Sequence, residues 1–193
     1  MASKALNIIL RGFQVRVTTQ TIPARSSSAL TNTAQFFWTL LIMALVGSII
    51  ADAFSGNPSV INYSMFVAVF AMLSLFYLIP ATVKDGLGAP LIMMGLDIAN
   101  TLFFLCGGIA LAAYLGVHSC SNDGYTKSNS ITNGAPDTQK RCREAQASTA
   151  FLWFGFAAFA ASAVFSFLQR RDGLAGSSGA SSVRGPAPSM SQV

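Results

Sequence analysis

The sequence carries little charge. Of its 193 residues, 12 are Lys or Arg and 7 are Asp or Glu, so charged residues make up 10% of the chain, against roughly 25% in an average soluble domain. Apolar residues make up 52%. So few charged residues cannot supply the polar surface of a water-soluble protein of this size, and a disordered chain would have far fewer apolar residues. The composition excludes both classes and indicates a membrane protein.

The sequence also lacks the residue groupings that most chemistry needs. His118 is the only histidine, and no Ser-His-Asp set can be assembled around it. There is no glycine-rich phosphate loop, no Cys-x-x-Cys motif and no pair of carboxylates within one apolar run. The net charge of +5 comes from scattered basic residues without a nucleic-acid recognition motif. We therefore expect no enzyme activity, no cofactor, no metal site and no nucleic-acid partner.

Long stretches without charge are what the sequence has instead. Runs 26–51, 53–83 and 145–169 contain no charged residue, and run 86–122 is interrupted only by Asp97 and His118. An ionised side chain at the centre of a bilayer costs about 2.5–3.5 kcal/mol, and a spanning helix needs roughly 20 apolar residues. Each run is long enough, and the interrupted one predicts a helix over 91–117. The predicted fold is an all-α membrane protein, a bundle of four transmembrane helices within residues 1–171.

Positive charges are distributed unevenly between the predicted connections. With both termini and the connection 84–90 on one side, that side holds eight Lys and Arg residues and the other side holds four. Cytoplasmic segments of membrane proteins carry the excess of Lys and Arg. We therefore expect both termini to be cytoplasmic and the segment 118–144 to be an extracellular loop. Residues 172–193 are rich in Gly, Ser, Ala and Pro, which predicts a disordered cytoplasmic tail.

The amino-terminal 35 residues have an unusual composition, with four basic and no acidic residues. With their Ser and Thr content they are typical of a mitochondrial transit peptide, which makes the mitochondrial inner membrane an alternative location. A second interpretation is that residues 15–35 are a translated intron, because without them Gln14 joins Phe36 and the apolar helix runs on unbroken. The sequence leaves open whether residues 15–35 exist in the mature protein.

Three cysteines occur, Cys106 within the third predicted helix and Cys120 and Cys142 near the two ends of the predicted outer loop. An oxidising compartment allows a disulfide there. A Cys120–Cys142 bridge would close a loop of 23 residues, counted inclusively, and stabilise the fold by roughly 3 kcal/mol in the chain-entropy model. We expect this disulfide. The alternatives are two free thiols, or a zinc site with His118 that would have only three ligands.

Asp97 is a carboxyl inside a predicted span, and Asn100, three positions on, shares its helix face. An intramembrane carboxyl is a candidate functional site, either an ion- or proton-coupled site of a small transporter or channel or a contact with a lipid headgroup. The other interpretation is a polar clasp, hydrogen-bonded to a neighbouring helix near the cytoplasmic end. We favour the clasp, because a transporter should repeat such groups on several spans, and the second and fourth spans offer only uncharged Ser, Tyr and Gln.

Small residues recur at four-residue spacing in the third predicted helix, at Gly108, Ala112 and Gly116. Such a ridge lets two helix backbones approach closely in a membrane. We expect these residues to pack helices within one bundle, with a contact between copies in a homo-oligomer as the alternative.

An ordered series of short motifs runs from the third predicted helix to the fourth. It comprises Leu96-Asp97-Ile98-Ala99-Asn100, His118-Ser119-Cys120-Ser121-Asn122, Ser128-Asn129-Ser130-Ile131-Thr132 and Arg141-Cys142-Arg143-Glu144-Ala145-Gln146-Ala147. In this series the sequence resembles the fungal non-classical export protein family, small four-span membrane proteins with a MARVEL-type domain. The resemblance covers most of the chain except residues 15–35.

The resemblance implies a function that composition alone does not give. Members of the family are organisers of plasma-membrane microdomains associated with the eisosome, and they respond to sphingolipids. The partners implied are membrane lipids, sphingolipids among them, together with eisosome and other membrane proteins. The rival expectation, which comes from the residues, is a small transporter or channel centred on Asp97.

Overall fold

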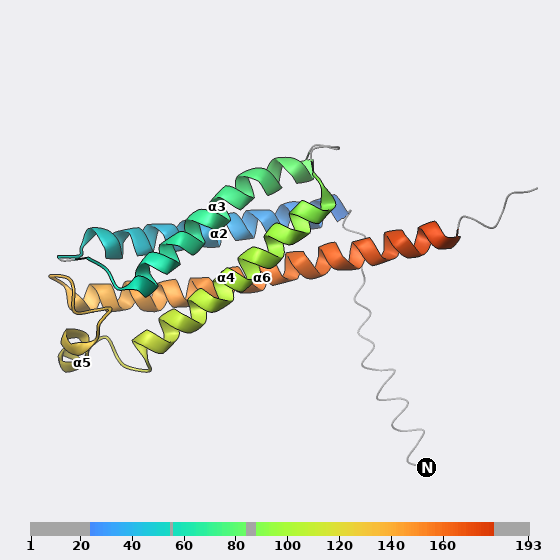
Figure 1. Ribbon diagram of the computed structural model, residues 1–193. Helices are drawn as coiled ribbons and strands as arrows, with labels where there is room; N and C mark the ends of the chain where they lie inside the picture. Colours follow the sequence, from blue (N-terminus) through green and yellow to red (C-terminus); the bar gives the residue numbers. More distant parts are fainter. Residues whose placement is uncertain (1–23, 55, 84–87, 180–193) are drawn as a thin grey trace, which may run out of the picture.

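The computed structural model describes residues 24–54, 56–83 and 88–179, and its regular elements in these ranges are helices (Figure 1). Four are long, namely α2 (Ala24–Ala51), α3 (Ser59–Val83), α4 (Pro90–Leu115) and α6 (Thr138–Gly179). The short helix α5 (Asp123–Ser128) lies between α4 and α6 in the chain. Each long helix contains a stretch that is long and apolar enough to cross a membrane. The predicted all-α fold with four spans is confirmed.

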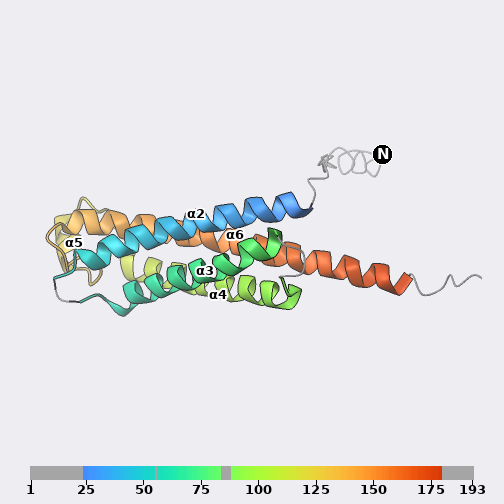
Figure 2. The same cartoon turned by 90° about the horizontal axis from the view of Figure 1, so that it is seen from above.

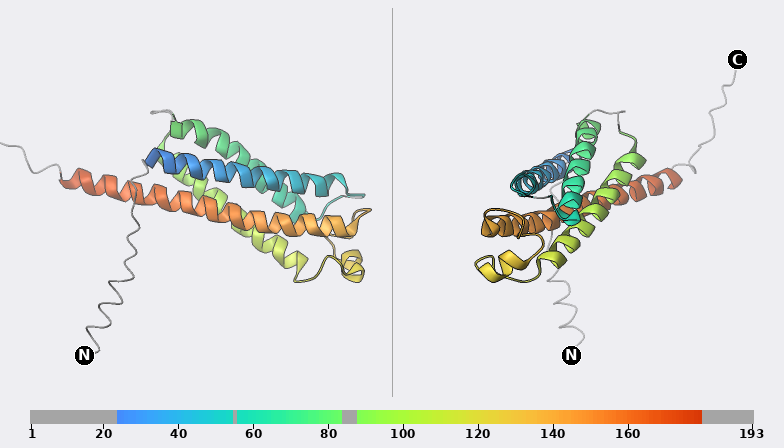
Figure 3. Two further views of the ribbon diagram at one scale, coloured as in Figure 1. Left: turned by 180° about the vertical axis from the view of Figure 1, so that it is seen from behind. Right: turned by 60° about the vertical axis from the view of Figure 1, so that its left-hand side comes forward.

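The four long helices lie side by side in one bundle (Figure 2). α6 packs against α2 and α4, and α3 packs against the same two helices, so the order around the bundle is α2, α3, α4, α6. α6 extends past the other helices where α2 begins (Figure 2), and we call this the tail end. α5 lies at the opposite end, beside the start of α6 (Figure 3). We call that the loop end, formed by residues 52–54, 56–58 and 116–137 together with the first turns of α6.

Apolar side chains lie both inside and outside the bundle. The interior is filled mainly by Ile42, Val46, Ile49, Val67, Leu75, Phe104, Leu111, Leu152 and Phe159. Large apolar side chains on the outer surface include Phe66, Leu73, Phe76, Leu102, Phe154 and Phe165. A helix that is apolar on all sides belongs in a protein core or in a membrane. The outer surface of the bundle is therefore suited to contact with the hydrocarbon core of a membrane.

Two helix boundaries differ from the sequence prediction. α6 begins at Thr138, seven residues before the charge-free run, because the Asp137 carboxylate accepts a hydrogen bond from the Lys140 backbone N–H at 2.8 Å and caps the helix. α4 ends at Leu115 and not at Val117, because Gly116 has a φ of 61° that turns the chain out of the helix. The prediction equated helix with apolar run, so it missed the polar first turns of α6.

The two segments singled out near the chain ends are only partly described. Of residues 15–35, residues 15–23 lie outside the described part, and residues 24–35 form the first turns of α2, where Asn32 and Gln35 are buried. At the other end, α6 continues to Gly179, although residues 172–179 belong to the segment predicted to be disordered. Between Thr138 and Pro186 the sequence has no proline that would stop the helix sooner. Residues 180–193 lie outside the described part.

Candidate functional site

Asp97 joins two helices inside the bundle, near the tail end. It lies early in α4, and only 3% of its surface is exposed. Ser162 of α6 donates a hydrogen bond from its hydroxyl to Oδ2 of Asp97 at 2.6 Å. Asn100, one turn on, is also buried, and its Nδ2 donates to the Leu96 carbonyl of its own helix at 2.9 Å. The Asp97 carboxyl thus links α4 to α6.

Gln35 of α2 brings a third helix to the same place. Its side chain is fully buried, and its Nε2 donates to the Ala158 carbonyl of α6 at 3.4 Å. Ala158 and Ser162 are one turn apart on α6, so Gln35 and Asp97 contact neighbouring turns of that helix. We call Gln35, Asp97, Asn100 and Ser162 the polar layer.

The polar layer has more acceptors than donors. Oε1 of Gln35, Oδ1 of Asp97 and Oδ1 of Asn100 are buried and have no hydrogen-bond partner among the residues described. An ionised carboxylate can only accept, and no Lys or Arg in the described ranges forms an ion pair with Asp97. A protonated Asp97 would carry a donor to this layer, and a neutral acid also avoids the cost of a buried unpaired charge. We therefore expect Asp97 to be neutral.

The three small residues of the predicted ridge have different surroundings in the structure. Gly108 is buried against α6, and a Cβ there would lie 3.4 Å from Cε2 of Trp153. Ala112 and Gly116 are exposed, and they line a shallow apolar hollow of about 200 Å³ between α4 and α6. Of the three, Gly108 is the one at a close helix contact, whereas Gly116 terminates α4.

Among the described glycines, the one with least space for a side chain is a residue that the sequence analysis did not select. A Cβ at Gly155 would lie 2.2 Å from Cε1 of Phe104, so the Phe104 ring occupies the space that a side chain would need. Both residues are buried, and Phe104 also lies against Phe159, with ring centroids 5.1 Å apart. The one available signal was a glycine within a run of large apolar residues.

A disulfide joins the two cysteines at the loop end. Cys120 and Cys142 are bonded, with their Cα atoms 5.7 Å apart. The bridge ties the segment that follows α4 to the second turn of α6. With both sulfurs in the bridge, neither the free-thiol nor the zinc alternative describes this structure. The third cysteine, Cys106, is a free thiol exposed on α4.

The loop around α5 covers the last carbonyl groups of α4. The hydroxyl of Tyr125 donates to the Leu115 carbonyl, and Nδ2 of Asn129 donates to the Tyr114 carbonyl at 2.9 Å. These carbonyls have no partner within α4, because the last turn of a helix leaves its acceptors free. Burial raises the pKa of the Tyr125 hydroxyl above its usual value, and the His118 ring stacks on the Tyr125 ring. The loop thus caps the carboxyl-terminal end of α4.

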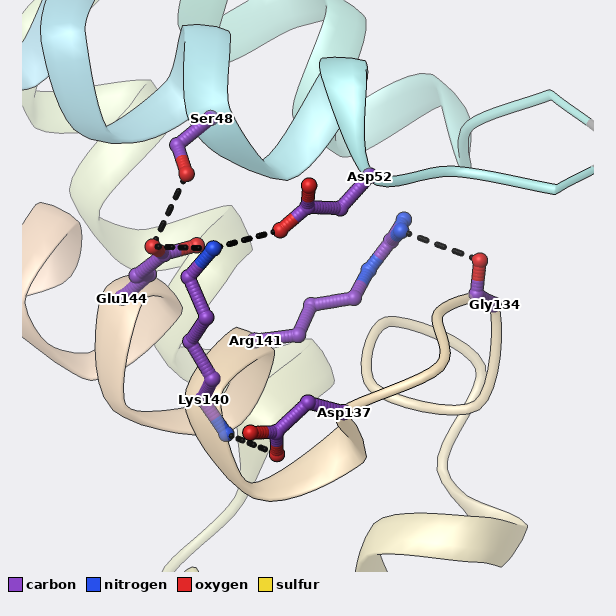
Figure 4. A network of polar contacts seen from close by, with 7 residues as sticks. All are labelled: Ser48, Asp52, Gly134, Asp137, Lys140, Arg141 and Glu144. Carbon is purple, nitrogen blue, oxygen red and sulfur yellow. Dashed lines mark hydrogen bonds and ion pairs between the residues drawn. The ribbon is translucent and has the colours of Figure 1, made fainter.

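Charged residues form a network where α6 meets the end of α2 (Figure 4). Lys140 forms ion pairs with Asp52 at 2.7 Å and with Glu144 at 3.7 Å, and Glu144 accepts a hydrogen bond from Ser48 at 2.9 Å. Asp52 and Ser48 belong to α2 and the turn after it, so the network fastens α6 to α2. The sequence analysis used Lys140 only as a positive charge of the outer loop.

Arg141, next to this network, is almost completely buried, with 1% of its surface exposed. Its guanidinium donates to the carbonyl of Ile131 at 2.7 Å, to the carbonyl of Gly134 at 3.3 Å and to Oδ1 of Asn57 at 2.8 Å. These bonds connect α6 to the loop that follows α5 and to the turn before α3. A buried arginine cannot be recognised from sequence when it lies in a run of charged residues.

Comparison with known proteins is consistent with this architecture. Residues 23–165 match the model of the MARVEL family, described as a membrane-associating domain. The chain is 38% identical over 160 residues to "Non-classical export protein 102" of Candida albicans, which covers 82% of this chain and 92% of that protein. It is 33% identical over 132 residues to "Non-classical export protein 2" of Saccharomyces cerevisiae, which covers 68% of this chain and 74% of that protein.

A third relative, the "Non-classical export protein 2 homolog" of Schizosaccharomyces pombe, is 33% identical over 135 residues, covering 68% of this chain and 72% of that protein. No solved structure matches the chain. The family model spans all of α2, α3, α4 and α5 and most of α6, and these relatives come from three different fungi. The four-span bundle described above therefore belongs to the MARVEL family of membrane-associating domains, within the fungal non-classical export proteins.

Proposed function

We propose that this protein is a non-enzymatic scaffold of the plasma membrane that organises lipid microdomains and eisosome assembly. In this proposal both termini are cytoplasmic, the loop end faces the outside, and the protein responds to sphingolipids and is linked to non-classical export. Its partners are membrane lipids, eisosome and other membrane proteins, and a second copy of itself in a homo-oligomer. Support for the export link comes from the names of the relatives.

The observation that carries the proposal is the way the bundle divides polar from apolar surface. Gln35, Asp97 and Asn100 are buried between helices, whereas large apolar side chains cover the outside. Such a body interacts with the bilayer through its length and shape, and a mismatch between a span and the local bilayer thickness sorts proteins between membrane regions. Microdomains of different lipid content then hold the protein to different extents.

Location is the first test of the proposal. We expect a carboxyl-terminal fluorescent fusion, expressed from its own promoter in the source fungus, to form patches in the plasma membrane. When sphingolipid synthesis is blocked, the patches should redistribute while the total fluorescence stays constant. Labelling of mitochondria would favour the inner-membrane alternative, and a uniform reticulum would contradict both locations.

Orientation needs a separate test. Protease added to intact spheroplasts should cleave within the loop end and leave a carboxyl-terminal tag on the protein undigested. Permeabilised spheroplasts are the control, since there the tag should be removed as well. Digestion of the tag in intact spheroplasts would reverse the proposed orientation.

A small transporter or channel is the second candidate function. The observation in its favour is the set of unpartnered buried oxygen atoms around Asp97 in the polar layer. In that case the Asp97→Asn variant should lose ion or proton flux in liposomes that contain the purified protein, while the wild-type protein conducts. Absence of flux for both proteins would leave the scaffold as the function.

A further inference from the structure

The loop end contains a polar hollow of about 370 Å³. It opens between the turn that precedes α3 and the loop that precedes α6. The residues that line it are Gly56, Asn57, Pro58, Ser130, Asn133, Gly134 and Arg141. Arg141 is the only charged residue in this lining, so the one formal charge at the wall of the hollow is positive.

The positive charge of Arg141 has no carboxylate in contact with it among the residues described. Its three hydrogen bonds go to uncharged oxygens of Ile131, Gly134 and Asn57. A guanidinium has five N–H groups, so one N–H on each Nη atom remains. Asp52 and Glu144 act on it only at longer range, and both form ion pairs with Lys140. Buried charges are normally paired, so Arg141 has room for an anionic partner.

Other donors surround the same hollow. Oδ1 of Asn57 accepts from Arg141, which leaves the Nδ2 group of the same amide to donate elsewhere. The side chains of Ser130 and Asn133 form no hydrogen bond with the described part of the chain, and both are exposed. Pro58 directly precedes α3, so the hollow lies where the spans leave the membrane.

We propose that this hollow binds a phosphate group, carried either by a lipid headgroup or by a soluble phosphate. A phosphate group carries several acceptor oxygens on one phosphorus atom, and the hollow is lined by donors from an arginine, two amides and a hydroxyl. Arginine is the side chain best suited to phosphate recognition. The site does not depend on the proposed scaffold function, because binding would occur in any protein with this loop end.

The test uses the purified full-length chain and a variant that spares Arg141, since Arg141 also holds the loop. Asn133→Asp places a negative charge in the lining at nearly constant shape and breaks no described hydrogen bond. Asn122→Asp is the matched control, because it adds the same charge in the same loop outside the hollow and keeps an acceptor for the helix cap that Asn122 forms with Gly124 and Tyr125.

Two probes distinguish the two sources of phosphate. In lipid-free detergent, inorganic phosphate is titrated while thermal unfolding is followed. In a parallel experiment, native mass spectrometry counts the retained phosphatidylinositol and, as the control without phosphate, the retained diacylglycerol. We expect at least one phosphate-bearing probe to bind, with an affinity lowered about tenfold or more in Asn133→Asp because of charge repulsion and unchanged in Asn122→Asp.

Binding of inorganic phosphate alone would assign the site to a soluble anion, and selective retention of phosphatidylinositol would assign it to a lipid headgroup. Either result, combined with the loss in Asn133→Asp, supports the site. The proposal is overturned if neither probe binds, or if Asn133→Asp binds as well as the wild-type protein. Neither outcome bears on the location of the protein, so the scaffold proposal is tested separately.

Discussion

Asp97 is the residue of the polar layer that links two helices through their side chains, because its carboxyl, on α4, accepts a hydrogen bond from Ser162 of α6. If the carboxyl is neutral, Asp97→Asn keeps its shape and its acceptor and supplies a donor in place of the acid proton. We expect the free energy of unfolding of this variant to lie within about 1 kcal/mol of the wild-type value. Asp97→Leu should lower the free energy of unfolding by roughly 1–3 kcal/mol, because Ser162 and its neighbours lose a hydrogen-bond partner. Denaturation of the purified proteins in detergent measures both.

Ser162→Ala is the control from the other side of the bond. It removes the donor while leaving Asp97 in place, so its loss should resemble that of Asp97→Leu more than that of Asp97→Asn. If Asp97→Asn unfolded as readily as Asp97→Leu, the carboxyl would have to be ionised in the native state, and the clasp of neutral groups would be wrong.

Gly155 sets the distance between α4 and α6. Gly155→Ala would place a methyl group against the Phe104 ring, and overpacking of this kind costs typically about 1–3 kcal/mol. Gly47→Ala in α2 is the matched control, since a Cβ at Gly47 meets nothing within 4 Å and alanine is the better helix former by about 1 kcal/mol. In the same unfolding assay we expect opposite signs for the two variants. Equal effects would contradict close packing at Gly155.

Sequence reasoning at this scale was best for residues that break a local pattern. Asp97 stands out as a carboxyl in an apolar run, and the two loop cysteines stand out by their position. Arg141 and Gly155 do not, because an arginine among charged residues and a glycine among apolar ones show their roles only when a loop or an aromatic ring from elsewhere in the chain is placed against them.

At the scale of elements, the disulfide holds the cap of α4 on the start of α6. Removing it with a reductant, or with Cys142→Ser, should destabilise the protein by roughly 3 kcal/mol in the chain-entropy model. Cys106→Ser is the control and should leave stability unchanged, because Cys106 is free and exposed. Thermal unfolding measures the loss. Alkylation of the unfolded, unreduced chain should modify one cysteine, and modification of all three would exclude the bridge.

The helices themselves followed from the sequence, whereas their polar ends did not. Charge-free runs locate the part of a helix that lies in hydrocarbon, and this part was found for all four spans. The first two turns of α6 and the helix α5 depend on caps at Asp137 and Asn122 and on bonds to the ends of α2 and α4. Such contacts form only between segments that the fold brings together, so an apolar pattern cannot indicate them.

At the scale of the whole molecule, the number of spans was predictable and their arrangement was not. Hydropathy counts four crossings, but the order α2, α3, α4, α6 around the bundle is decided by which faces pack. The same limit applies to the polar layer, where Gln35 meets α6 although 123 positions separate it from Ala158. Gln35 even lies in the segment that the intron hypothesis removes.

That hypothesis now makes a structural prediction. If residues 15–35 are absent, Gln14 takes the position of Gln35, so a glutamine still precedes Phe36 and can donate to the Ala158 carbonyl. Arg11 then takes the position of Asn32, which is buried near the tail end, and its side chain is long enough to extend from there toward the membrane surface. If the hypothesis is right, the dominant transcript lacks the codons for residues 15–35, and a chain made without them unfolds at least as cooperatively as the full chain. Transcript sequencing and denaturation of both chains in detergent test this. Codons 15–35 in the dominant message would reject the intron hypothesis. A shortened chain that does not fold would show that α2 needs residues 24–35 as they stand.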